Sequence, residues 1–129
     1  MVRKVNIDLR SADADLRAEP PVVEDALFHC QQTIEKSLKG FLAWHNRAFQ
    51  KIHDLRKLAE SCLSIEPELE AILSRVPPLT GYAWVFRYPG ETPDATVDEA
   101  QAALDLARAV VNAVLSRLPP EIRPQLKSS

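Results

Sequence analysis

The feature that most constrains the fold of this chain is the spacing of apolar residues between residues 22 and 44. Apolar side chains recur there every three or four positions, which places them on one face of an α-helix and leaves polar side chains on the other. That face consists of Val23, Leu27, Cys30, Ile34, Leu38 and Phe41. Because such a stripe must be buried against other elements, the segment predicts a long helix packed within a helical domain.

Other parts of the chain repeat this pattern between its ten prolines. Helices are predicted at about 52–63, 66–75 and 97–118, with a shorter and weaker candidate at 8–17. The last helix opens on a capping box, with Thr96 at the cap and Glu99 three residues on. Its apolar residues recur in steps of three and four, which is typical of a bundle seam: Val97, Ala100, Leu104, Ala107, Val111, Val114 and Leu118.

These segments predict an all-α fold, an antiparallel up-and-down helical bundle of four to five helices. A length of 129 residues suits one domain, and 46% hydrophobic residues suit a globular core. We expect the single domain to span residues 1–129, with residues 1–7 and 120–129 flexible.

Composition also excludes several classes of protein. A net charge of -2 and a pI of about 5.9 argue against a constitutive nucleic-acid binder with a strongly basic surface. No apolar run approaches the ~20 residues of a membrane span, and the charged N-terminus lacks the apolar stretch of a signal peptide, so we expect a cytoplasmic protein without membrane contact.

Metal and cofactor sites are not predicted either. Cys30 and Cys62 both fall on apolar helix faces and form no Cys-x-x-Cys pair, so we expect reduced core thiols rather than zinc ligands. We find no carboxylate pair with metal-ligand spacing and no glycine-rich phosphate loop, and we expect no cofactor.

The uneven distribution of charge points to a candidate anion site. Residues 29–58 carry a formal charge of +4 and contain all three histidines of a chain that is acidic overall. Four of these side chains share one stripe of the long helix and could hold a phosphate and a base edge: His29, Gln32, Lys36 and Lys39. The alternative is a solvated helix face on which Glu35 and Lys39 form an i,i+4 ion pair.

Arg47 and His53 are candidates for catalysis. A histidine can move a proton near neutral pH, and an arginine can stabilise the charge that develops on a phosphate, so together they could cleave RNA. The alternative for His53 and the neighbouring ligand candidate Asp54 is a structural role in the first turn of a helix, where the helix dipole favours an acidic residue.

Arg87 and Tyr88 are further ligand candidates, within an aromatic-rich loop predicted at 77–95. An arginine beside an aromatic ring is a common phosphate-binding and stacking pair. The alternative is a loop whose other aromatic residues pin it to the bundle.

Four segments in this order resemble the HEPN domain family: residues 26–42, 51–58 with Lys51-Ile-His53-Asp54-Leu55, 86–89 with Phe-Arg-Tyr-Pro, and 97–118. The resemblance implies an antiparallel helical bundle that is usually homodimeric. Many relatives pair with a minimal nucleotidyltransferase, often as toxin and antitoxin. Some are metal-independent ribonucleases that use an arginine and a histidine from each protomer at the dimer cleft.

Three functional hypotheses follow. The first is a nucleotide- or RNA-binding module paired with a nucleotidyltransferase, in which Lys36 and Lys39 face the same cleft as Arg87 and His53. The second is a metal-independent endoribonuclease toxin with Arg47 as phosphate clamp and His53 as general acid and base. The third is a structural adaptor whose exposed apolar stripe, with Phe28 and Leu42, binds a partner helix.

Overall fold

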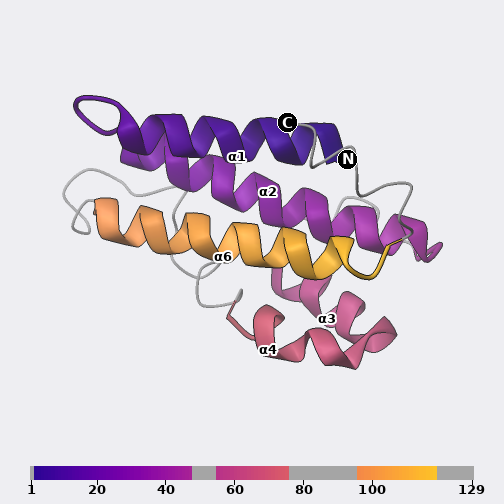
Figure 1. Cartoon of the computed structure of the whole chain (residues 1–129). Coiled ribbons are helices and arrows are strands. Elements are labelled where there is room, and N and C mark those ends of the chain that lie inside the picture. Colours follow the sequence, from indigo (N-terminus) through magenta and orange to yellow (C-terminus); the bar gives the residue numbers. More distant parts are fainter. Residues whose placement is uncertain (1, 48–54, 76–95, 119–129) are drawn as a thin grey trace.

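The computed structural model describes residues 2–47, 55–75 and 96–118, and it is helical in all three ranges (Figure 1). The elements in chain order are α1 (Val2–Arg17), α2 (Val23–Trp44), α3 (Leu55–Ile65), a short 3-10 turn η1 (Pro67–Leu69), α4 (Glu70–Leu73) and α6 (Val97–Leu115). The described residues contain no strand, which confirms the all-α bundle. None of these helices is both long and apolar enough to cross a membrane.

The long helices α1, α2 and α6 lie side by side and form the main layer of the bundle (Figure 1). α1 and α2 form an antiparallel hairpin, which is tied at its turn by a hydrogen bond of 2.8 Å from the Val22 N–H to the Asp15 carbonyl. α6 runs in the same direction as α2 and packs against both helices of the hairpin. α3 and α4 pack against α2 and α6, respectively.

α1 begins at Val2, so the prediction of a short helix starting near Asp8 was wrong. Val5 and Ala12 are buried against the bundle, and Asp8 between them is only 7% exposed. The face of α1 that meets α2 therefore carries a carboxylate at a core position, which interrupts the apolar periodicity in the sequence. Packing on α2 stabilises a helix whose own pattern is weak.

α2 confirms the predicted long helix almost to the residue. Of its predicted apolar face, Leu27, Cys30, Ile34 and Leu38 are fully buried and Phe41 is 1% exposed. Leu42 is also fully buried, so the prediction that it belongs to an exposed stripe was wrong, whereas Phe28 is 42% exposed. A 22-residue helix enclosed by α1, α3 and α6 buries more of its circumference than a two-sided pattern suggests.

The C-terminus of α2 ends in a Schellman motif that sets the position of Arg47. Asn46 adopts a left-handed conformation with φ 56°, which asparagine tolerates better than most residues. The Asn46 N–H donates to the Ala43 carbonyl at 3.1 Å, and the Arg47 N–H donates to the Leu42 carbonyl at 2.9 Å. These bonds satisfy carbonyls that the helix end would otherwise leave unpaired.

The remaining helices bury the residues that the sequence predicted. In α3 these are Leu55, Leu58, Ala59 and Cys62. The single helix predicted at 66–75 is instead the 3-10 turn η1, with Pro67 in its first turn, followed by α4. In α6 the Thr96 hydroxyl accepts from the Glu99 N–H at 3.0 Å, which confirms the cap, and the predicted seam is buried except for Val97.

Both cysteines are free thiols in the core, as predicted. The Cys62 thiol donates to the Leu38 carbonyl at 3.7 Å. Burial raises the pKa of Cys30 and of Cys62 to about 12, because a thiolate would lose its hydration there. Neither cysteine is therefore suited to act as a nucleophile.

Candidate functional site

The α1–α2 interface is polar along one edge, where Asp8 of α1 meets two cationic candidates of α2. The Asp8 carboxylate accepts from His29 Nδ1 at 2.9 Å and from Lys36 Nζ at 2.6 Å. Asp8 is buried, whereas the side chains of His29 and Lys36 are partly accessible to solvent. The structure thus brings His29 and Lys36 together, seven residues apart on one stripe, through a carboxylate of another helix.

Lys39 and Gln32 extend this stripe. Lys39 Nζ donates to Glu35 Oε2 at 3.2 Å, which confirms the i,i+4 ion pair expected between them. Glu35 is buried, so water and salt screen the attraction between Glu35 and Lys39 less than they screen an ordinary surface pair. Gln32 is half-buried on the same face. The stripe is therefore a partly buried row in which His29, Lys36 and Lys39 contact carboxylates and Gln32 is neutral.

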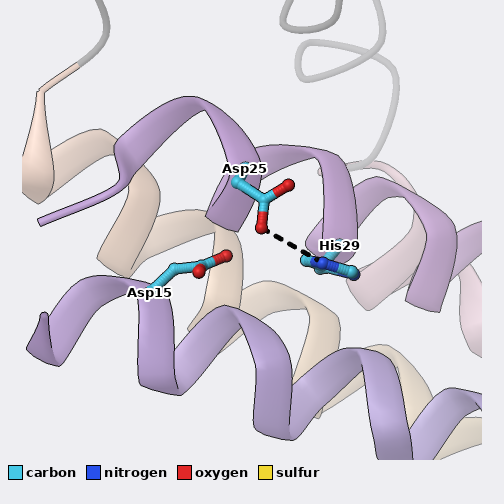
Figure 2. Close-up of side chains that lie close together, drawn as sticks. All are labelled: Asp15, Asp25 and His29. Atoms are coloured by element: carbon cyan, nitrogen blue, oxygen red, sulfur yellow. Dashed lines mark ion pairs between the residues drawn. The ribbon is translucent and has the colours of Figure 1, made fainter.

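A second cluster lies near the turn between α1 and α2, where Asp15, Asp25 and His29 point toward one another (Figure 2). One ligand atom from each residue lies within 4.8 Å of the other two. His29 Nε2 is 3.3 Å from Asp25 Oδ2, and the two residues are one helical turn apart on α2. Asp15 comes from α1, so the cluster spans both helices of the hairpin.

The electrostatics of this second cluster are unusual for a helical surface. The pKa of Asp15 is raised to about 6, first because burial removes water from its carboxylate and then through a hydrogen bond to Asp25 and the negative charge of Asp25. The positive charge of His29 acts in the opposite direction. Asp15 Oδ2 is buried and has no hydrogen-bond partner among the described residues. The site therefore favours a proton or another cation between its carboxylates.

Of the candidate catalytic and loop residues, only Arg47 is described. It is exposed directly after the end of α2. His53, Asp54, Arg87 and Tyr88 lie outside the described residues, so a cleft shared by Arg87, His53 and the lysines stays a prediction, as does the pairing of Arg47 with His53.

Sequence reasoning missed Asp8, Asp15 and Asp25, although their spacing carried a signal. Asp8 and Asp15 are seven residues apart, and Asp25 and His29 are four apart, so each pair shares one face of its helix. The signal became meaningful only once the two helices were known to pack with these faces together. No local pattern specifies that pairing.

Comparison with known proteins identifies one relationship. Residues 1–118 match the sequence profile of the HEPN domain, which covers every described helix. No curated protein and no solved structure shows significant similarity to the chain.

Proposed function

Because this chain belongs to the HEPN domain family, we propose that it is a nucleotide- or RNA-binding helical module that acts with a minimal nucleotidyltransferase, as in toxin–antitoxin pairs. The observation that carries the proposal is the family match over residues 1–118 of a chain whose residues 29–58 carry a net charge of +4, although the whole chain is acidic. We further propose that the protein acts as a homodimer.

The basic residues of this window differ in how available they are to a phosphate. Lys36 and Lys39 are engaged by the carboxylates of Asp8 and Glu35, so a phosphate has to compete for them. Arg47, in contrast, is exposed at the end of α2. The Schellman motif uses its backbone N–H and not its guanidinium, which can form paired hydrogen bonds with phosphate oxygens.

The ion pairs give the stripe a second property. Lysine side chains that are fixed by carboxylates lose less conformational entropy when a ligand binds than side chains that move freely. Paired lysines also contribute less net positive charge. We therefore assign Arg47 the main phosphate contact and assign Lys36 and Lys39 a supporting role.

A binding experiment tests this assignment. Purified protein is titrated against fluorescently labelled single-stranded RNA and against ATP at several salt concentrations. We expect Arg47→Ala to weaken RNA binding and to reduce the slope of log affinity against log salt by about one, the effect of losing one phosphate contact. Arg10→Ala, which removes an exposed arginine from α1, is the matched control and should leave both values unchanged.

The same protein distinguishes the alternatives. RNA cleavage that persists in EDTA and disappears in His53→Ala would support the endoribonuclease hypothesis instead of a binding module. Absence of binding to both RNA and ATP, with normal helical circular dichroism, would contradict the proposed function. Co-expression with a nucleotidyltransferase encoded beside this chain, followed by co-purification and size determination, tests the partner and the dimer.

A further inference from the structure

We propose that Asp15, Asp25 and His29 form a binding site for a divalent transition-metal ion, which joins α1 to α2 near the turn of their hairpin. The sequence alone led us to expect no metal. The proposal does not rest on the proposed nucleotide or RNA binding: His29 also belongs to the candidate phosphate stripe, but the metal site combines it with Asp15 and Asp25 rather than with basic residues.

The first argument is the geometry of the donor atoms. An imidazole nitrogen and two carboxylate oxygens lie within 4.8 Å of one another, and they come from two helices that pack together. Asp25 and His29 are one turn apart on α2, so their side chains extend from the same face. Figure 2 shows the Asp15 carboxylate approaching this pair from α1.

The second argument is the orientation of the His29 ring. His29 Nδ1 is 2.9 Å from Asp8 Oδ1, a contact that places the ring proton on Nδ1 when the imidazole is neutral, the form that binds a metal ion. In that form the lone pair of Nε2 faces Asp25 Oδ2 at 3.3 Å, and two acceptors at this distance repel each other unless a cation lies between them. A carboxylate that holds the distal nitrogen of a metal-bound histidine is a common feature of metal sites.

The third argument is the unsatisfied oxygen of Asp15. Its Oδ2 is buried, lacks a hydrogen-bond partner among the described residues, and belongs to the carboxylate that points into the cluster. Buried carboxylates are normally paired with a cation or with hydrogen-bond donors. A metal ion would bind the unpaired oxygen of Asp15, and its positive charge would offset the repulsion between the carboxylates of Asp15 and Asp25.

The donor set indicates the class of metal. Imidazole suits zinc, nickel, copper and iron, whereas magnesium and calcium prefer oxygen ligands alone. Three protein ligands leave further coordination positions for water. The Asp25 side chain is 52% exposed, so an ion can reach the site from solvent. The alternative is an ion pair in which a protonated His29 bridges Asp8 and Asp25 without metal.

Zinc titration of the full chain tests the proposal. Protein stripped with EDTA and dialysed at pH 7.5 is titrated with zinc chloride by isothermal calorimetry. We expect one ion per chain and, with free zinc at about 100 times the dissociation constant, a rise of roughly 8–10 °C in the thermal midpoint. Magnesium at millimolar concentration should leave the midpoint unchanged. Cobalt should produce visible absorption bands that disappear in His29→Gln.

Variants separate coordination from folding. We expect His29→Gln and Asp15→Asn each to weaken zinc binding at least tenfold, because even the loss of a group that only supports a metal ligand typically costs about 10–100-fold in affinity. Zinc-free Asp15→Asn should be at least as stable as the native protein, because its amide can donate to Asp25, so its loss of binding would not reflect unfolding. His45→Gln, which removes an exposed histidine at the opposite end of α2, is the matched control.

Three outcomes would overturn the proposal. The first is the absence of zinc binding by the native chain up to about 1 mM zinc. In that case the cluster would be only an ion pair of His29 with Asp8 and Asp25. The second is zinc affinity that survives both His29→Gln and Asp15→Asn, since the ion would then lie elsewhere. A midpoint rise with magnesium equal to that with zinc would refute the assignment to a transition metal.

Discussion

The contact between Lys36 and Asp8 gives a quantitative test of how α1 is held on the bundle. We consider Lys36→Met, which keeps most of the aliphatic stem and removes the ammonium group. Lys36 Nζ lies 2.6 Å from Asp8 Oδ2, and the Asp8 side chain is only 9% exposed. The substitution therefore leaves a buried carboxylate with His29 as its remaining hydrogen-bond partner.

The expected magnitude follows from this burial. Removing one partner of a fully buried ion pair costs about 3–5 kcal/mol, whereas surface pairs contribute about 0–1 kcal/mol. The Lys36 side chain is 31% exposed, so water screens part of the interaction and the expected loss lies between these limits, at about 1.5–3 kcal/mol. For a domain of this size, that loss lowers the thermal midpoint by roughly 5–10 °C.

Urea unfolding followed by circular dichroism at pH 7.5 measures the loss as a lower midpoint with an unchanged slope. The matched control is Arg17→Met, which removes the ion pair between Arg17 and Asp13 at 3.1 Å on the exposed side of α1. Its expected cost is below ~0.5 kcal/mol, because the Arg17 side chain is 79% exposed.

A double-mutant cycle isolates the pairwise contribution. Asp8→Asn combined with Lys36→Met should cost less than the sum of the single changes, because no buried carboxylate remains without its lysine. The reasoning would be refuted if Lys36→Met destabilised the protein no more than Arg17→Met, or if the two changes at the Asp8 contact were additive.

Three further predictions concern the core and the helix ends. Cys30 and Cys62 should resist alkylation by iodoacetamide at pH 8 in the folded protein and react rapidly in urea, because their pKa of about 12 keeps them protonated; equal rates in both states would contradict their burial. Thr96→Ala should destabilise the protein by about 1 kcal/mol in urea unfolding, and Thr96→Ser, which retains the hydroxyl cap, should restore most of the loss. Ala107→Leu should cost about 1–3 kcal/mol, because Ala107 is fully buried on α6; a thermal midpoint equal to the native value would show that the helices have room there.

The sequence predicted best where a helix shows its own periodicity. α2 matches its predicted range closely, α3 ends two residues beyond its predicted end, and α6 ends at Leu115 rather than at 118; nearly all their apolar positions are buried. Thr96 caps α6 as its spacing with Glu99 indicated. These features depend on neighbours within one or two turns, so the local sequence is enough to specify them.

Predictions were weaker where a residue's environment is supplied by another helix. The length of α1 was underestimated because Asp8 occupies a core-facing position and interrupts the apolar pattern. Leu42 was assigned to an exposed stripe, although it is fully buried. Among the candidate site residues, His29 and Lys36 were identified, but the buried carboxylate that holds both was not. Nothing within α2 indicates that Asp8 is its partner.

The sequence by itself therefore determined the helical class, the extent and inner face of the main helices, and the family. The helices follow from the spacing of residues within each segment, and the family follows from motifs in a fixed order along the chain. Only the tertiary structure decided which charged groups meet. Asp8 with Lys36, and Asp15 with Asp25 and His29, are brought together by the packing of α1 on α2. The physical reason is that charge interactions depend on distance and burial, and both are set by how helices pack rather than by the order of residues within them.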